Sequence, residues 1–275
     1  MFDYIVIGGG SAGCVLAARL SEDPNVSVCL LDAGPADKSV LIHCPAGLAL
    51  MAQTGQANWA FETVPQAGLN GRRGYQPRGK VLGGSSSVNA MVYLRGPRDD
   101  YDAWAAAGNP GWGFDELLPY FKRSEHHERG ADAFHGSGGP LNVMDLRSPN
   151  RFGPVFVEAG RQAGYPLNPD FNGAEQEGVG IYQVTHKAGE RFSAAKAYLT
   201  PNLSRPNLTV MTWYMPTPSC VGPLKSAFLT KPACTAASTN TGPKRFGLRR
   251  SITFSGPPVP CSASAPRSLC SDFLK

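Results

Sequence analysis

The first part of the chain combines two apolar runs with one amphipathic segment. Asp3–Ile7 and Val26–Leu31 are short, β-rich apolar runs of the kind that form buried strands. Between them, Ala12–Ser21 has apolar residues at helical spacing and is followed by Glu22-Asp23-Pro24, a helix stop signal. The order strand, helix, strand is that of a βαβ unit. The pattern therefore predicts an α/β fold that opens a doubly wound, Rossmann-type parallel sheet.

The chain between this unit and Thr212 predicts more helices than strands. Helical spacing favours helices at Asp99–Ala107, Phe114–Glu125, Pro154–Ala163 and Ser193–Leu199, and strands are expected at Gly180–His186 and Leu208–Met211. Ser193 is a candidate N-cap for the last of these helices. Ala33–Arg78 is rich in Pro, Gly and Asn and is expected to be irregular.

A glycine-rich turn joins the first strand to the first helix. Gly8, Gly10 and Gly13 form G-x-G-x-x-G, in which the glycines allow a tight turn, close approach of a pyrophosphate, and close packing of helix on strand. Asp32 ends the second strand, where a carboxylate can accept hydrogen bonds from ribose hydroxyls. The pattern predicts a dinucleotide site; the alternative is a structural turn that binds no nucleotide. The motif alone does not distinguish FAD from NAD.

A second glycine corner lies in Pro77–Gly96. Gly83-Gly84 predicts a flexible turn with exposed amides, and three serines follow it at what resembles a helix start. The apolar residues Met91–Leu94 come next and argue against a surface loop. A long cofactor with two phosphates and a flavin would need such a corner, so we expect the two corners at opposite ends of an extended site.

Composition and charge divide the chain near Thr212. Residues 213–275 hold eight of the 26 basic residues and one of the 21 acidic residues, so the first 212 carry a net charge of −2 and do not favour a nucleic-acid partner. We therefore expect a folded part at 1–212 and an irregular tail at 213–275. The tail has the composition of a disordered segment or of a stretch translated out of frame. We favour the second because disordered tails are usually poor in Cys and rich in acids.

Cysteine usage and hydropathy bear on the compartment. No pair of cysteines has metal-ligand or redox spacing, so no metal site is expected, and Cys14 and Cys29 are predicted to be buried thiols. Met1 leads directly into a strand without a signal peptide, and no apolar stretch is long enough to span a bilayer. These features predict a cytoplasmic protein.

The sequence resembles the glucose-methanol-choline (GMC) oxidoreductases, and among them the choline dehydrogenases and acceptor-linked alcohol dehydrogenases. The matching stretches cover about residues 2–212 and include Phe2–Pro35, Asn58–Thr63, Pro77–Gly96, Phe134–Gly136, Gly139–Leu141, Asp170–Gly173, Arg191–Leu199 and Arg205–Leu208. The resemblance implies an incomplete Rossmann-type FAD-binding domain, with FAD as the cofactor.

The resemblance also assigns residues to that cofactor. The pyrophosphate would be held by Gly8, Gly10, Ser11, Ala12 and Gly13, and the ribose would be bound by Asp32. The cofactor would be lined by Val81, Gly83, Gly84 and Ser85, and the flavin ring would be passed by Asn89, Ala90, Met91 and Val92. Some relatives tether the flavin through a His at the position of Val88, so Val88 predicts non-covalent FAD.

The implied activity is oxidation of choline or a primary alcohol to the aldehyde, with hydride transfer to flavin and electrons passing to a quinone or another acceptor. A quinone acceptor would agree with peripheral association at the inner face of a membrane. Relatives are roughly twice as long and carry a catalytic His near the C-terminus, to which none of the five histidines here corresponds.

We therefore expect a truncated and inactive chain whose first βαβ unit lacks sheet neighbours and exposes apolar surface. A non-catalytic FAD-binding fragment is the alternative. An NAD-dependent dehydrogenase is disfavoured by Gly83–Asn89.

Overall fold

The computed structural model describes residues 1–214, which form two compact units. One unit comprises Met1–Asp37, Thr54–Val88 and the described residues from Ala194 on, and the other comprises Lys38–Gln53 and Asn89–Ser193. The tail expected at 213–275 lies outside the described residues except for Trp213 and Tyr214.

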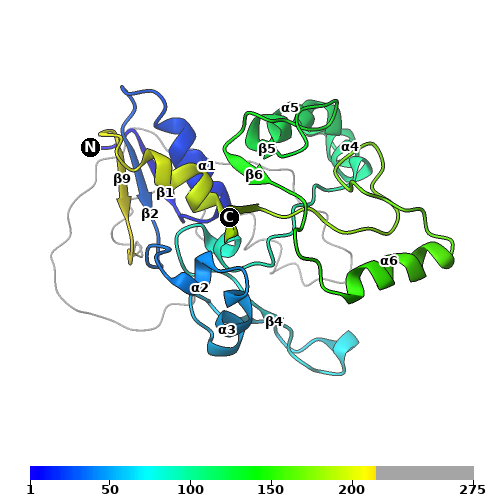
Figure 1. Cartoon of the computed structure of the whole chain (residues 1–275). Helices are drawn as coiled ribbons and strands as arrows, with labels where there is room; N and C mark the ends of the chain where they lie inside the picture. Colours follow the sequence, from blue (N-terminus) through cyan, green and yellow to red (C-terminus); the bar gives the residue numbers. More distant parts are fainter. Residues whose placement is uncertain (215–275) are drawn as a thin grey trace. The chain divides into compact units, whose positions relative to one another are not determined.

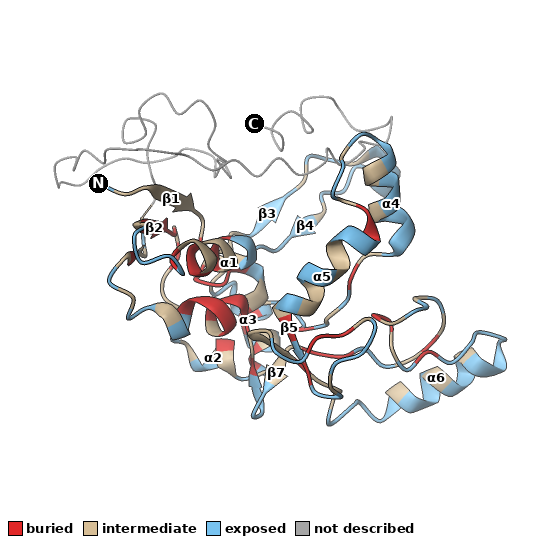
Figure 2. Cartoon of the chain, turned by 90° about the horizontal axis from the view of Figure 1, so that it is seen from above, coloured by how far each residue is buried: buried red, intermediate tan, exposed pale blue. Residues whose placement is uncertain are grey.

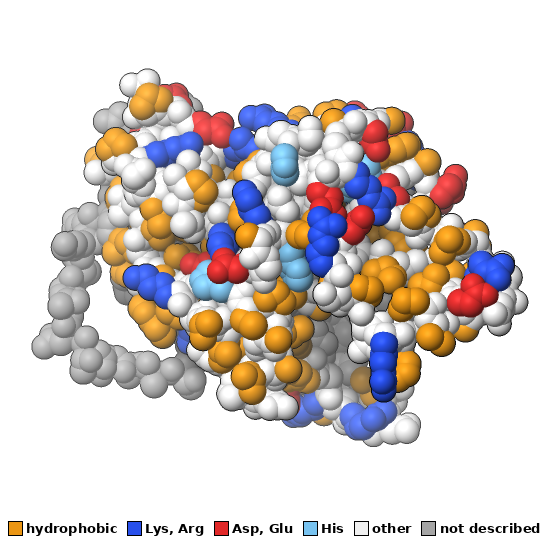
Figure 3. Space-filling view, viewed as in Figure 1, with side chains coloured by type: hydrophobic (Ala, Val, Ile, Leu, Met, Phe, Trp, Pro, Cys, Tyr) orange, Lys and Arg blue, Asp and Glu red, His pale blue; other side chains and the backbone are white. Residues whose placement is uncertain are grey.

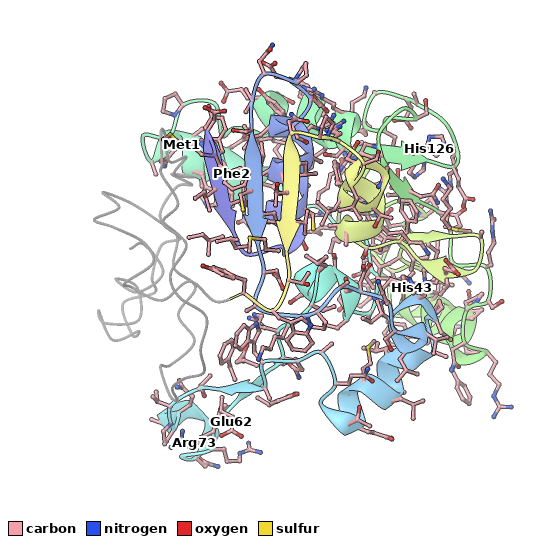
Figure 4. The ribbon with its side chains drawn as sticks, turned by 90° about the vertical axis from the view of Figure 1, so that its left-hand side faces the viewer. Met1, Phe2, His43, Glu62, Arg73 and His126 are labelled. Atoms are coloured by element: carbon pink, nitrogen blue, oxygen red, sulfur yellow. The ribbon has the colours of Figure 1, made fainter. Side chains whose placement is uncertain are left out.

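The first unit is built on a parallel sheet of three strands. β1 (Tyr4–Ile7), β2 (Val28–Leu31) and β9 (Leu208–Met211) lie in the order β1-β2-β9, and α1 (Ser11–Leu20) connects the first two. Val28 is paired with Tyr4 on one side and with Leu208 on the other. Figures 1 and 4 show the three strands side by side with α1 against the sheet. The predicted βαβ unit and the strand at 208–211 are confirmed.

Burial explains why these segments take these forms. Every residue of β2 is buried, because the strand lies between two others and under a helix, whereas the side chains of β1 are half-buried. The expectation that this βαβ unit lacks sheet neighbours is therefore wrong, because β2 pairs with β9; among the described residues β1 pairs with β2 alone. α1 buries Cys14, Ala17 and Ala18, small residues that allow close packing on the sheet (Figure 2). The prediction that Cys14 and Cys29 are buried is also confirmed.

A short π-helix also packs on α1. It spans Ala195–Leu199, and four of its five residues are buried. The helix predicted at Ser193–Leu199 is present, and Ala194, directly after Ser193, already has helical backbone angles.

The rest of the first unit consists of short elements. They are the antiparallel pair β3 (Phe61–Glu62) and β4 (Tyr75–Gln76) and the 3-10 helices η1 (Ala67–Leu69), η2 (Gly84–Ser87) and η4 (Thr200–Asn202).

The second unit carries five helices and two small sheets in its described residues. The helices are α2 (Val40–His43), α3 (Gly47–Thr54), α4 (Arg98–Ala106), α5 (Phe114–Ser124) and α6 (Phe152–Gln162); β5 (Glu125–His127) pairs in parallel with β6 (Leu141–Val143), and β7 (His186–Lys187) pairs with β8 (Glu190–Arg191) in a hairpin. The three predicted helices of this unit are confirmed within two residues at each end.

Two expectations for secondary structure need correction. Ala33–Arg78 is not irregular throughout, since it contains α2, α3 and the β3-β4 pair; His43, labelled in Figure 4, ends α2. Gly180–His186 is not a strand. Only Val184 forms bridges there, to Val92 and to Met144, and the strand β7 begins at His186.

The core of the second unit is polar at its centre. Arg95, Glu125, His127 and His135 are all buried. The charged run Lys122–Glu125 ahead of His126 and His127 suggests that both rings are solvated, but only His126 is exposed and His127 is buried. α6 instead leaves its apolar residues in solvent, with Phe152, Val155 and Phe156 at 62%, 63% and 72% exposed, so this face is not part of the described core (Figure 3).

Candidate cofactor-binding site

The turn between β1 and α1 needs glycine at two positions for reasons internal to the protein. Gly8 has φ of +96°, a region that other residues rarely adopt, and its N–H donates to Leu31 O at 2.7 Å. A Cβ at Gly13 would lie 1.8 Å from Gly8 O. The first and third glycines therefore shape the turn and bring the helix against it.

Gly10 is different, because neither the backbone nor the packing requires a glycine there. It has φ of −74° and an extended conformation open to any residue, and a Cβ built on it would meet no described atom within 4 Å. It directly precedes α1, whose first-turn N–H groups at Ser11, Ala12 and Gly13 have no acceptor inside the helix. Open space in front of free amides and a positive helix end is suited to a diphosphate.

Asp32 joins this turn to the end of β2. Its Oδ2 accepts the N–H of Gly9 at 2.7 Å and its Oδ1 accepts the N–H of Gly34 at 2.7 Å. Burial raises the pKa of Asp32, and the hydrogen bonds from Gly34 and Gly9 counteract part of that rise. Each carboxylate oxygen keeps further acceptor capacity, so the side chain can still receive a ribose hydroxyl.

The second glycine corner lies directly against the first. Gly83, with φ of +86°, donates its N–H to Gly9 O at 2.7 Å, and a Cβ on Gly84 would lie 2.7 Å from Gly10 Cα. The expectation that the two corners lie at opposite ends of an extended site is therefore wrong. They form one surface, and Gly84 allows the close approach of the two backbones.

The residues around this corner are used mainly to hold its shape. Val81 is buried, and Gly84 N–H donates to Val81 O at 2.8 Å. Ser86 Oγ donates to Gly83 O at 2.6 Å, and Ser85 Oγ accepts the N–H of Gly79 at 3.2 Å. The predicted exposed amides are thus in part engaged within the protein, and the predicted helix start is the short 3-10 helix η2.

The segment assigned to the flavin ring belongs to the second unit. Asn89 Oδ1 accepts the N–H of Met91 at 3.0 Å, and Met91 has φ of +63°, which is unusual for a residue with a side chain. Met91 is buried, while Ala90 and Val92 are exposed. The exposed side chains of Ala90 and Val92 lie on either side of this buried, constrained residue and are available to face a ring.

Arg191 was not recognised from the sequence as part of this segment's environment. Its buried guanidinium donates from Nη1 to Asn89 O at 2.6 Å and to Asn89 Oδ1 at 3.0 Å. The available signal was the position of Arg191 at the start of the matching stretch Arg191–Leu199.

The buried His127 and His135 and the partly buried His186 all contact other side chains. His135 Nδ1 lies 3.0 Å from Glu125 Oε1 and its Nε2 lies 2.8 Å from Asp170 Oδ2. His127 stacks on His135 with ring centroids 4.0 Å apart. His186 Nε2 lies 3.0 Å from Met91 Sδ, and both burial and the charge of Arg191 lower its pKa.

These features define a dinucleotide-binding α/β fold, and sequence comparison places it in a family. The family profile described as GMC oxidoreductase matches residues 2–217. The chain therefore belongs to the GMC oxidoreductases, as its motifs indicated.

Characterised relatives agree with this assignment. The alcohol dehydrogenase [acceptor] of Pseudomonas putida is 53% identical over 213 residues, a match that covers 77% of this chain and 39% of the relative. The mitochondrial choline dehydrogenase of Mus musculus is 47% identical over 214 residues, covering 75% of this chain and 36% of the relative. The chain thus spans well under half the length of these relatives.

A solved structure supports the fold and the cofactor. An FAD-dependent oxidoreductase from Chaetomium thermophilum superposes with a TM-score of 0.70 at 32% identity, covering 77% of this chain and 38% of that one. The family and this FAD-dependent neighbour identify FAD as the cofactor of the fold. In the described residues no helix is long and apolar enough to cross a membrane, and no group of His, Cys, Asp and Glu could hold a metal ion.

Proposed function

We propose that this chain carries the FAD-binding part of an oxidoreductase that converts choline or another primary alcohol to the aldehyde and passes the electrons to a quinone or a similar acceptor. The names of the relatives, an acceptor-linked alcohol dehydrogenase and a choline dehydrogenase, support this substrate class. When bound, FAD accepts the hydride that leaves the carbinol carbon.

The open space at Gly10 carries the proposal. A glycine that neither the turn nor the packing needs is explained by a ligand that approaches the backbone closely. Gly8 and Gly13 shape that approach, and the amides of Ser11 and Ala12 would bind the diphosphate. A turn that served the fold alone would have no such requirement at Gly10.

The other residues have distinct parts in holding the cofactor. Asp32 would accept the ribose hydroxyls, and a carboxylate there would repel the 2′-phosphate of a phosphorylated nucleotide. Val81, Gly83, Gly84 and Ser85 would line the cofactor beside the diphosphate, and Asn89, Ala90, Met91 and Val92 would pass the flavin ring. Val88 has no nucleophilic atom, so the flavin is held without a covalent bond.

We further propose that this polypeptide on its own binds FAD without oxidising alcohol. The reaction needs a base that takes the hydroxyl proton of the alcohol. His135 is held between two carboxylates and His127 is stacked beneath it, so neither is available for that step. An alcohol-dependent dye-reduction assay checks this point, and any turnover by the purified chain contradicts it.

A matched set of glycine variants tests the cofactor site. Gly10→Ala should leave the melting temperature unchanged, because the new methyl group meets no protein atom, and should weaken FAD binding by at least about tenfold. Gly13→Ala should lower the melting temperature, because its Cβ would collide with Gly8 O. Gly68→Ala is the control, since its Cβ also meets nothing within 4 Å and it lies away from the turn.

The outcomes are read from FAD titrations followed by flavin fluorescence. Unchanged FAD affinity in Gly10→Ala would remove the support for the diphosphate site. Acid precipitation of the FAD-loaded chain should leave the yellow colour in the supernatant; colour retained in the pellet would contradict non-covalent binding.

The location proposed for the protein is the cytoplasm, with peripheral attachment to the inner face of a membrane as its route to a quinone. Fractionation of cells that express the full chain tests this location. Recovery of the chain in an extracytoplasmic fraction would contradict it.

A further inference from the structure

We propose that Arg191 is a positioning residue for the flavin, acting through Asn89 to fix the shape of the segment Asn89–Val92. This inference rests on the proposed function, since it concerns the segment assigned there to the flavin ring. It adds a residue to the cofactor site that makes its contribution from behind the contact segment.

The guanidinium of Arg191 holds two distant parts of the second unit together. Its side chain is only 1% exposed. Nη1 donates to both oxygens of Asn89, the backbone O at 2.6 Å and Oδ1 at 3.0 Å, and Nε donates to Ile42 O at 2.8 Å. One nitrogen therefore fixes the backbone and the side chain of Asn89 at the same time, and the bond from Nε to Ile42 fixes the plane from which that nitrogen donates.

Asn89 transmits this constraint to Met91. Its Oδ1 accepts the N–H of Met91 at 3.0 Å, and Met91 lies in the left-handed region with φ of +63°. The Met91 O accepts the N–H of Thr185 at 2.9 Å. A residue with a side chain keeps such a backbone conformation only where its surroundings enforce it, and such residues gather at ligand sites. Without Arg191, the orientation of the Asn89 side chain would no longer be fixed.

The charge of Arg191 is kept at a cost. Burial lowers its pKa to about 10, so the group is still protonated at neutral pH while desolvated. An apolar residue of similar size would fill the same space without that cost. The hydrogen bonds to Asn89 and Ile42 give a reason for an arginine at this position.

A double-mutant cycle separates positioning from general stability. FAD affinity is measured for the full chain, for Arg191→Gln, for Asn89→Ala and for the double variant. Arg191→Gln should weaken FAD binding by about tenfold or more, and the double variant should bind no more weakly than the weaker single variant, because both changes break one pathway. If the double variant loses FAD affinity by the product of the two single losses, Arg191 does not act through Asn89 and the proposal is overturned. Unchanged FAD affinity in Arg191→Gln would overturn it as well.

Arg95→Gln is the matched control. Arg95 is the other buried arginine of the same unit, and its guanidinium bonds Phe134, Asn172 and Glu125. The control should lower the melting temperature and leave FAD affinity unchanged. If it weakens FAD binding as much as Arg191→Gln, loss of any buried arginine explains the effect and the proposal fails.

Hydrogen exchange gives a readout that needs no flavin. In the chain without FAD, Arg191→Gln should speed amide exchange at Ala90–Val92 more than elsewhere in the unit, and Arg191→Lys, which keeps the charge but loses the planar group, should give an intermediate rate. Equal exchange rates at Ala90–Val92 in the unchanged chain, Arg191→Gln and Arg191→Lys would overturn the proposal. Failure of the unchanged chain to bind FAD would instead refute the proposed function.

Discussion

The buried imidazole of His135 should make the stability of the second unit depend on pH in the neutral-to-alkaline range. Its ring is 1% exposed and lies between the carboxylates of Glu125 and Asp170, at 3.0 Å and 2.8 Å. Arg95 Nη2 lies 2.8 Å from the other oxygen of Glu125. His127 stacks on the ring, Asp132 Oδ1 accepts the backbone N–H of His135 at 2.7 Å, and burial raises the pKa of Tyr93, which interacts with Glu125 and Arg95.

The magnitude follows from the pKa of His135. Burial lowers this pKa, but the hydrogen bonds to Asp170 and Glu125 outweigh burial and raise it from 6.5 to about 9. Between these two values the folded chain holds a proton that the unfolded chain has lost. The free energy of unfolding should therefore fall as pH rises, by up to about 1.4 kcal/mol per pH unit and by roughly 3 kcal/mol in all. Below pH 6.5 this contribution is fully present.

Urea unfolding at a series of pH values from 6 to 9.5 measures this dependence. His135→Gln cannot be protonated, so it should remove most of the slope. At pH 6 it should cost about 3 kcal/mol, because it leaves the buried Glu125 and the partly buried Asp170 without a cation between them. His126→Gln is the control, since it removes an exposed imidazole from the adjacent strand and should keep the slope. A slope that persists in His135→Gln, or its absence in the unchanged chain, would refute the assignment of a charged His135.

Two further predictions concern the first unit. Asp32→Ala should lower both the melting temperature and FAD affinity, because the amides of Gly9 and Gly34 lose their acceptor. Asp32→Glu should retain more of both, and equal losses in Asp32→Ala and Asp32→Glu, measured by thermal melts and FAD titrations, would contradict this role. Burial raises the pKa of the Cys14 thiol to about 12, whereas Cys44 is exposed. When the native chain is treated with iodoacetamide at pH 8, peptide mass spectrometry should find Cys44 alkylated and Cys14 unmodified, and rapid labelling of Cys14 would show that α1 is not packed as described.

Local signals were sufficient for the glycine-rich turn after β1 and for the long helices. The turn is defined by glycines at fixed spacing between an apolar strand and a helix, all within one short stretch of sequence. α4, α5 and α6 have enough turns for their helical spacing to be visible. α2 and α3 were missed because α2 is a single turn capped by Ser39 and because Pro45 separates the two helices.

What sequence reasoning missed depends on partners far away in the chain. His127 follows a charged helix end and gives a solvated pattern, but Gln183 contacts its ring from 56 residues further along the chain. Arg191 meets Asn89 across a separation of 102 residues. The contact of the two glycine corners is likewise a tertiary feature, since Gly83 pairs with Gly9. Sequence spacing identifies which residues are suited to a ligand, but not which of them lie together.

The order of the sheet shows where the features that distinguish this protein are encoded. β2 pairs directly with β9, so the chain between Leu31 and Leu208 is inserted between two adjacent strands of one parallel sheet. The glycine-rich turn between β1 and α1 precedes this insertion, and a βαβ unit with such a turn is common to many nucleotide-binding proteins. The second glycine corner, the constrained Met91 and the Arg191–Asn89 contact all lie within the insertion. Changes that separate one GMC oxidoreductase from another in flavin handling should therefore concentrate there, and the βαβ unit should tolerate exchange with that of a relative.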